Sequence, residues 1–581
     1  MWDQHGPFLW IPSLFHRHPY LSMIRSSLLS TIVVLMLGGP LWAGLPLSAQ
    51  GQTADDVLRY SDQLPAGGGP VVGRAGAGLS SGFAAPDALF GNPAGLGWLS
   101  SSTISGDFAT NRTQSDTRFS TPDATASSDR GVSDYRIGSI AGAYSFPTTQ
   151  GSLVIGASFH QSNTYEREFD VVGVNQTNSI TSTFISPYSF DDGDIVFDEP
   201  ISATAYEAGA IGFSGNPQIT PAVNFDTSAV AGRMALEQQE NISESGQMNE
   251  LSFGVATAIA PKVMIGGSLK ITSGSYTFER FYRETDIGQG QTNPICSSPG
   301  LCPPRNLQNP QPPYDPYFLE GEAVEGFDEM QLEDRIDTDL SGVNFQFGLS
   351  AEPTDALRVG VHVESPTWLE VNEVFGTEMR TFFDCDFSSE SCVRPDEPFS
   401  SGNLTGNEFS YDLRTPWRFG GGLQYSLGEL TIAGGATVID WNQAEVSRED
   451  GSSSDPNCGA QGLGPLEELN CDIQDLDTTV NTRVGLEYEA EAFAVRTGVA
   501  YQPSPMEQTF QDIDGNTTDG DRLFLSAGAS IALGENSSLH INWLQKRFDD
   551  QFTSYSSESE SPTVRETLRR NRVLIGITYR P

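Results

Sequence analysis

The strongest constraint on this chain is an alternation of apolar and polar residues with a period of two, which begins near Arg136 and recurs to the C-terminus. In its clearest form, apolar residues alternate over residues 251–259, a turn follows at Ala260-Pro261-Lys262, and alternation resumes over 263–271. Successive side chains of a β-strand point to opposite faces, so this pattern predicts two antiparallel strands joined by a tight turn. We therefore expect an all-β fold.

The connections between these strands have two very different lengths. Turns within a hairpin are short, whereas the segments between hairpins are long, polar and acidic. Further hairpins are predicted over residues 345–363, 419–439, 484–501 and 523–543, with a last strand over 573–579. Short periplasmic turns and long external loops are typical of outer-membrane barrels. A soluble β-sandwich would also alternate but would not make every second connection long, so we predict a transmembrane antiparallel β-barrel over residues 106–581.

Composition and charge exclude two other classes of protein. Hydrophobic residues make up 38% of the chain and its mean hydropathy is −0.28, too polar for a bundle of spanning helices that each need about 20 apolar residues. Barrel strands need an apolar residue only at every second position. The formal charge of −43, from 75 acidic and 32 basic residues, argues against nucleic acid as a partner, because a phosphate backbone would be repelled.

The N-terminal residues predict export. Residues 23–49 run from a charged start through an apolar stretch to a small-residue tail that ends at Ala49, the order of a secretory signal peptide. A single membrane anchor is the alternative. Residues 1–22 are interpreted as a mis-called upstream start. Together with the barrel, this segment predicts a protein of the bacterial outer membrane.

The six cysteines form three close pairs in polar segments: Cys296 with Cys302, Cys385 with Cys392, and Cys458 with Cys471. Exported proteins meet an oxidising compartment, where such spacing favours local loop disulfides over a metal site. Other pairings of six cysteines remain possible from the sequence.

Residues 50–105 differ from the rest of the chain and are too rich in glycine and other small residues for a conventional core. Small residues can pack closely inside a barrel, so we interpret this segment as a plug, or hatch. It contains Gly73-Arg74-Ala75-Gly76 and Asn92-Pro93-Ala94-Gly95-Leu96. In Asn92-Pro93-Ala94, the Asn92 side chain would hold a turn by hydrogen bonds while Pro93 restricts its backbone.

These motifs and others that follow in order resemble the FadL/TodX family of outer-membrane transporters of long-chain fatty acids and other hydrophobic compounds. The later matches lie at Glu352-Pro353-Thr354-Asp355, Ser365-Pro366-Thr367, Thr415-Pro416-Trp417-Arg418, Asp440-Trp441, Arg483-Val484-Gly485 and Ser504-Pro505. Each is weak alone, but the ordered set is fairly specific and spans nearly the whole exported chain. It looks closest to a branch sometimes labelled haemin receptors.

The resemblance implies about 14 strands, a lumen filled by the hatch with its Asn92-Pro93-Ala94 motif, capture of a hydrophobic small molecule by external loops, and sideways release into outer-membrane lipid. It implies neither enzyme activity nor a cofactor. It also implies that the protein is a monomer and that the barrel-assembly machinery inserts it into the membrane. Ligand-binding residues cannot be transferred by motif. The alternative function is a receptor or structural barrel that binds an external partner and transports nothing.

Three other patterns have both a functional and a purely structural interpretation. Gly78-Leu79-Ser80-Ser81-Gly82 fits a hydrolase motif but lacks the strand and helix that the motif requires. Asp512, Asp514 and Asn516 form a weak calcium candidate whose spacing fails the EF-hand template, and an acidic loop is favoured. Arg565, Arg569, Arg570 and Arg572 in the last long segment are candidates for contact with anionic lipid headgroups, with a solvated rim as the alternative.

Overall fold

The computed structural model describes residues 54–581 except 123, 192–193, 215–218, 223–234, 288–316, 320–321, 387–397, 449–457, 459–464, 507–508 and 558–560. The predicted signal peptide, Cys296, Cys302 and Cys392 lie outside the described residues, as does the side chain of Cys385. Within the described residues no helix has the length and apolar character needed to cross a membrane.

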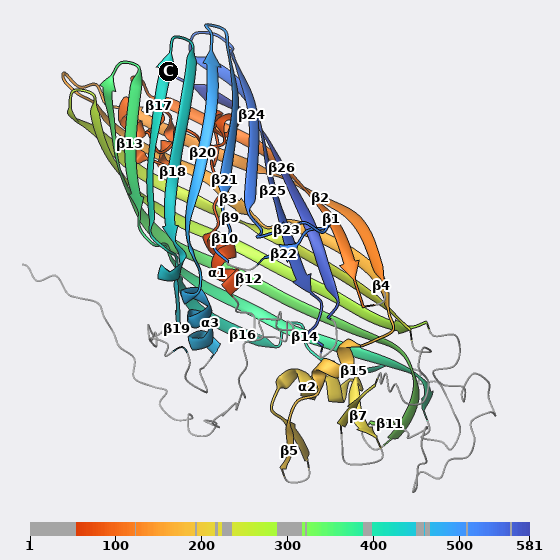
Figure 1. The fold of residues 1–581 in the computed structure, drawn as a ribbon. Coiled ribbons are helices and arrows are strands. Elements are labelled where there is room, and N and C mark those ends of the chain that lie inside the picture. The colour runs from red at the N-terminus through yellow and green to blue at the C-terminus, as the bar shows by residue number, and fades with distance from the viewer. Residues whose placement is uncertain are drawn as a thin grey trace, which may run out of the picture.

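The wall is a closed antiparallel barrel of 14 strands, some of which are interrupted and carry two labels (Figure 1). In order around the wall they are β1(Thr103–Ser120), β2(Thr125–Ser145), β3(Leu153–Thr164) continued by β4(Arg167–Asn175), β9(Leu236–Ala260), β10(Val263–Asp286), β12(Glu322–Thr354), β13(Leu357–Glu364) with β14(Trp368–Asp386), β17(Arg418–Leu427) with β16(Asn407–Arg414), β18(Leu430–Asp440) with β19(Glu445–Arg448), β20(Thr478–Glu489), β21(Phe493–Gln502), β24(Arg522–Ala532), β25(Ser537–Thr553) and β26(Thr563–Tyr579). The predicted barrel is confirmed.

The barrel closes where its first and last strands meet. β1 pairs with β26 without interruption from Ile104 opposite Tyr579 to Ser120 opposite Thr563. Apolar residues on the outward faces, such as Phe108, Ile575 and Ile577, are about half exposed, as expected for side chains that meet lipid. Short turns, including the one predicted at Pro261-Lys262, gather at one end of the barrel, near the C-terminus (Figure 1).

Residues 54–99 lie inside the barrel as short helices: α1(Ala54–Ser61) and the 3-10 helices η1(Pro70–Arg74), η2(Pro86–Phe90) and η3(Pro93–Trp98). We call this segment the hatch. Toward the other end of the barrel lie η4(Ile180–Phe184), α2(Pro200–Glu207), η5(Trp441–Gln443), α3(Pro465–Gln474) and the short strands β5(Tyr188–Asp191), β6(Asp194–Phe197), β7(Ile211–Ser214), β8(Ile219–Pro221), β11(Tyr317–Leu319) and β15(Phe399–Gly402). The small hairpin of β22(Phe510–Gln511) and β23(Thr517–Thr518) lies partway along the barrel (Figure 1).

Candidate functional site: the hatch, the outer lumen and a break in the wall

The hatch has little regular structure, so its buried carbonyl groups need hydrogen-bond donors from elsewhere. Side chains of the wall supply them. The donors and the hatch carbonyls that accept are Arg418 to Ser61, Gln502 to Gln63, Arg483 to Pro65, Arg572 to Gly67, Asn542 to Gly69, Ser350 to Ser81, Arg358 to Gly82, Lys270 to Phe90 and Gln346 to Gly91. The hatch is therefore fixed to many strands at once.

Asn92 lies at the start of η3 and joins the hatch to the wall. Its Oδ1 accepts from the backbone N–H of Ala94 at 3.1 Å, which caps the helix, and Pro93 occupies the first helical position. Its Nδ2 donates to the carbonyl of Ser80 at 2.9 Å, and to those of Leu349 and Val361, each at 3.2 Å. The side chain is fully buried, so these contacts form without competition from water.

Glycines of the wall make room for the hatch. A Cβ added at Gly498 of β21 would lie 2.3 Å from the Arg74 carbonyl carbon, and one at Gly266 of β10 would lie 2.5 Å from the Ala94 nitrogen. Similar close approaches occur at Gly254, Gly348, Gly360, Gly422, Gly485 and Gly528. Strand glycines often mark places where another segment of backbone approaches closely. The glycines of the wall thus allow the hatch backbone to pack directly against the strands.

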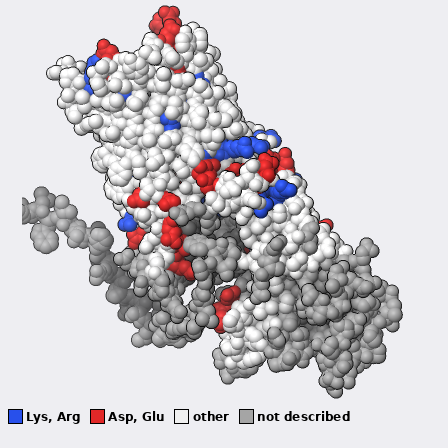
Figure 2. Space-filling view, viewed as in Figure 1, with Lys and Arg blue, Asp and Glu red and all other residues white. Residues whose placement is uncertain are grey.

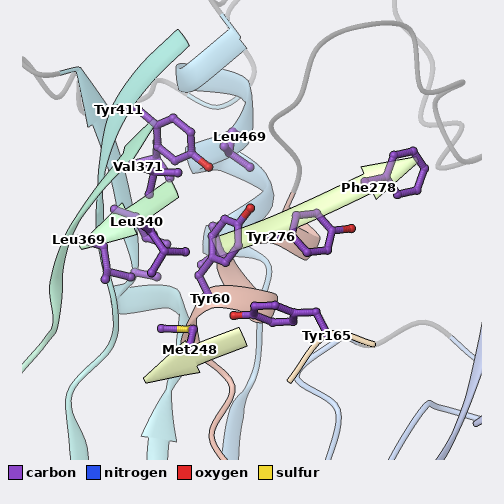
Figure 3. Close-up of a cluster of buried hydrophobic side chains, with 14 of the residues drawn as sticks. Tyr60, Tyr165, Met248, Tyr276, Phe278, Leu340, Leu369, Val371, Tyr411 and Leu469 are labelled. Carbon is purple, nitrogen blue, oxygen red and sulfur yellow. The ribbon is translucent and has the colours of Figure 1, made fainter. Parts of the chain in front are cut away.

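The outer half of the lumen holds an aromatic and apolar cluster beside buried charged side chains such as Arg280 and Glu240. Figure 3 shows Tyr60 of the hatch together with Tyr165 between β3 and β4 and Tyr276 of β10. Their rings meet edge to face, with the centroids of Tyr165 and Tyr276 5.4 Å apart, a favourable geometry for aromatic pairs. Apolar side chains from the surrounding strands complete the cluster, among them Met248, Phe278, Leu340, Leu369, Val371 and Leu413.

Helix α3 covers part of this aromatic cluster from outside. Its Leu466, Leu469 and Ile473 are buried in the same apolar cluster. The predicted disulfide between Cys458 and Cys471 is present, with a Cα–Cα distance of 5.6 Å, and it ties the helix to the segment before it. The other two predicted pairings stay predictions.

The wall is broken between β2 and β3. The ladder between them runs only from Ser145 opposite Val154 to Ser139 opposite His160, although β2 continues outward to Thr125 and β3 continues into β4. Beyond that point, among the residues that the structure describes, no backbone pairing joins the two strands. Two ion pairs span the separation: Arg136 with Glu166, and Arg130 with Asp170 at 2.5 Å.

At the break, the free edge of β3 is hydrogen-bonded from inside the barrel. The hatch residue Leu64 donates its N–H to the Ser162 carbonyl at 3.0 Å. Two arginines of β26 reach the neighbouring carbonyls: Arg570 donates to Thr164 at 2.7 Å, and Arg572 to Gln161 at 3.5 Å. The prediction that Arg570 and Arg572 contact lipid headgroups is therefore wrong, because both point into the lumen.

A polar cavity lies between the hatch and the wall opposite. Its lining includes Asp62 of the hatch with Arg418 and Arg483 of the wall. Lys546 approaches Asp62 to 2.8 Å and Arg522 to 3.5 Å. Burial alone would raise the pKa of Asp62, but the positive charges of Arg522 and Lys546 outweigh it and hold that pKa well below its usual value. The cavity borders the Tyr60 cluster through Ser61.

The remaining candidate residues make structural contacts. Ser80 is buried in the hatch, where its carbonyl accepts from Asn92. Asp107 lies between His540 and Ser139, each at 2.6 Å, so its carboxylate occupies the middle place, whereas a nucleophilic serine needs the histidine beside it. The Asp512 carboxylate accepts from the N–H groups of Asp514 and Asn516 and holds a hairpin tip. No cluster of three or more metal-ligating side chains occurs in the described part of the chain.

No protein-family model and no curated protein matches the chain. Among solved structures it is similar to a FadL homologue of Pseudomonas aeruginosa, at 12% identity and a TM-score of 0.47 over 89% of this chain and 99% of that one. It is also similar to the toluene transporter TodX of P. putida, with 12% identity, a TM-score of 0.44 and coverage of 89% and 99%. A third is the toluene transporter TbuX of Ralstonia pickettii, with 12% identity, a TM-score of 0.38 and coverage of 85% and 94%.

At this level of likeness, the architecture of the chain rests on its own strand pairing and on the contacts of its hatch. The break between β2 and β3 was not located from the sequence. Its one visible signal was the run of arginines near the C-terminus, which is too polar for a lipid-facing strand.

Proposed function

We propose that this outer-membrane barrel carries hydrophobic small molecules, such as long-chain fatty acids, from outside the cell into the outer membrane. The ligand would enter through the aromatic outer lumen and leave sideways through the break between β2 and β3. The break is the observation that carries the proposal, because a closed ladder would leave no path through the wall. The enzyme reading has no supporting geometry among the residues described.

The chemistry of the ligand fits this route. A hydrocarbon chain gains free energy when it leaves water for an apolar surface, and it gains again when it passes into lipid. The cluster around Tyr60, Tyr165 and Tyr276 offers such a surface on the side from which the ligand comes. The polar cavity beside Ser61, with Arg418 and Arg483 in its lining, could take a carboxylate headgroup.

The hatch residues between Leu64 and Gly67 are the proposed gate. Leu64 is bonded to Ser162 at the edge of the break, and the carbonyl of Gly67 is bonded to Arg572, which also reaches Gln161. A shift of these few residues would open the break while the Asn92 anchor keeps the rest of the hatch in place. Full expulsion of the hatch would cost all of its wall contacts, so a local shift is the cheaper movement.

A cross-link across the break tests the proposal. Cysteines at Arg136 and Glu166, whose side chains meet across the break, would be bridged by a short reagent that reacts with two thiols. The matched control places cysteines at Glu333 and Arg380, an ion pair of 3.0 Å where β12 and β14 form a continuous ladder. Uptake of radiolabelled oleate is then measured in cells that lack the native protein.

We expect the cross-link at the break to reduce uptake at least about tenfold, because the path through the wall is closed, and the control cross-link to leave it unchanged. Uptake by wild-type protein treated with the same reagent shows whether reaction at the native cysteines has an effect of its own. Equal uptake by both cross-linked proteins would refute lateral release. Equal uptake by cells with and without the protein would favour the alternative function, a receptor or structural barrel that transports nothing.

A further inference from the structure

The outward face of β1, β25 and β26 carries a group of arginines, which we call the arginine patch: Arg112, Arg118, Arg547, Arg565 and Arg569. Figure 2 shows Lys and Arg side chains gathered over these strands, part of the way along the barrel. The accumulation is unusual for a chain with a formal charge of −43. It also differs from Arg570 and Arg572, which are neighbours in sequence but face the lumen.

Within the patch, like charges face each other directly. Arg547 of β25 lies opposite Arg569 of β26, and Arg565 of β26 lies opposite Arg118 of β1. Like charges in directly opposite positions destabilise a sheet. Asp116 pairs with Arg569 at 2.5 Å, but within the described part of the chain the other four arginines make no ion pair with an acidic side chain. Arg118 donates to the Ile513 carbonyl at 2.9 Å and Arg565 to Gln551 at 3.4 Å. Asp549 lies opposite Thr567, between the two facing pairs, so the repulsion between the arginines is offset only in part.

The patch lies at the outer edge of the lipid-facing band. On β26 the outward residues Tyr579, Ile577 and Ile575 are exposed and apolar. Arg569 lies on the same face, ten residues before Tyr579 in the sequence. Ten residues span roughly 34 Å along a strand, or about 26 Å across the membrane at a tilt near 40°, close to the ~25 Å height of the apolar band of such barrels. Arg569 and its neighbours therefore reach the level of the lipid headgroups.

We propose that the arginine patch binds one lipid of the outer leaflet through phosphate groups on its headgroup. Guanidinium groups form paired hydrogen bonds with phosphate oxygens. The acyl chains would continue over Phe108, Ile541 and Ile575, which lie on the same three strands below the patch. Bound phosphate would remove the repulsion between the facing arginines. The inference does not depend on what the barrel transports.

The test measures binding of bis-phosphorylated lipid A to the purified, detergent-solubilised barrel by native mass spectrometry. Wild-type protein should retain one lipid A and should bind the dephosphorylated form ~10-fold more weakly or worse, since charge-assisted contacts are lost. Inorganic phosphate should not compete at equal concentration, because it lacks acyl chains. Equal retention of both lipid forms by the wild-type protein would overturn the proposal, whatever the behaviour of any variant.

Substitution locates the site. The quadruple variant R118Q/R547Q/R565Q/R569Q should lose lipid A by ~10-fold or more. The matched control R335Q/R380Q removes two outward arginines that are each paired with two acidic residues, and it should bind lipid A as the wild type does. Heat-modifiable migration confirms that each variant is folded. Undiminished binding by the folded quadruple variant would show that the patch is not the site.

Discussion

In the half of the lumen nearer the short turns, the wall meets the hatch through glycines and through side chains that donate to hatch carbonyls. In the outer half, the wall presents aromatic rings and aliphatic side chains, and a single helix from the far end packs over them. The first half is held by directional hydrogen bonds that fix one arrangement. The second combines apolar contacts with buried ion pairs, such as Arg280 with Glu240 and Arg167 with Glu566.

If the proposed function holds, the difference would let one barrel both seal and conduct. Sealing requires that no buried carbonyl is left without a donor, so the inner half combines arginine, asparagine and glutamine with close-packed glycine. Conduction requires a surface that a greasy molecule can slide along, so the outer half offers tyrosine and leucine. The break between β2 and β3 lies where these two halves meet, and residues from both contribute to it: Leu64 of the hatch and Tyr165 of the aromatic cluster.

The largest effect is expected when the hatch no longer fits the wall. In Gly498→Ala the new methyl group would lie 2.3 Å from the Arg74 carbonyl carbon, and backbone on both sides cannot yield. We expect a loss of ~3 kcal/mol or more of folding free energy, seen as a large drop in the temperature at which the barrel changes its mobility on a denaturing gel. Gly421→Ala, where the nearest atom is 3.8 Å away, is the control. Equal behaviour of the two variants would contradict the tight fit.

A smaller effect is expected from the hydrogen-bonded anchor. Asn92→Ala removes the bonds to Ser80, Leu349, Val361 and Ala94 and leaves buried groups unsatisfied, at a cost of ~2 kcal/mol. The same gel assay measures it. Asn372→Ala, which loses one exposed hydrogen bond to Ser410, should change stability by less than ~0.5 kcal/mol. If Asn92 anchors the hatch, the transition temperature of Asn92→Ala should lie clearly below that of Asn372→Ala. Similar transition temperatures would argue against this role of Asn92.

The smallest effect concerns the helix over the outer half. Burial, with the negative charges of Glu468 and Asp475, raises the pKa of Asp472 to about 6. A carboxyl group with a raised pKa in the docked helix destabilises docking as the pH rises from about 4 to 6, because the undocked form ionises first. Asp472→Asn should therefore strengthen docking at pH 7.5 by on the order of 1 kcal/mol after allowance for solvent screening.

Hydrogen exchange at the amides of α3 measures this effect. The advantage of Asp472→Asn should disappear near pH 4, where the native carboxyl is also neutral. Gln474→Asn, at an exposed position of the same helix, is the control. Equal protection of the wild type and the variant at pH 7.5 would contradict the raised pKa.

The sequence predicted the barrel because lipid imposes alternation on every strand that it touches. Residues 251–271 show this clearly, since their outward side chains are apolar and their inward ones are small or polar. The outer extensions of the strands were missed. In β9(Leu236–Ala260), residues 237–241 are polar on both faces, because that part extends beyond the lipid while its inner face carries charges such as Glu240, which pairs with Arg280. Without lipid on one side, alternation disappears.

The candidate site was predictable only in part, for a related physical reason. Asn92-Pro93-Ala94 could be recognised because a capped turn has a local sequence pattern. The break could not, since it consists of hydrogen bonds that are absent, and their replacements come from residues distant in the sequence, such as Leu64 to Ser162 and Arg570 to Thr164. The inward direction of Arg570 and Arg572 followed from strand register, which composition alone does not specify.

β26 has two tasks in this molecule: it completes the ladder with β1, and it brings Arg570 and Arg572 to the open edge of β3. The proposed exit route therefore depends on the closure of the barrel between β1 and β26. A barrel without this closure would hold its hatch with fewer donors and would leave the carbonyls of Gln161 and Thr164 without these two arginines.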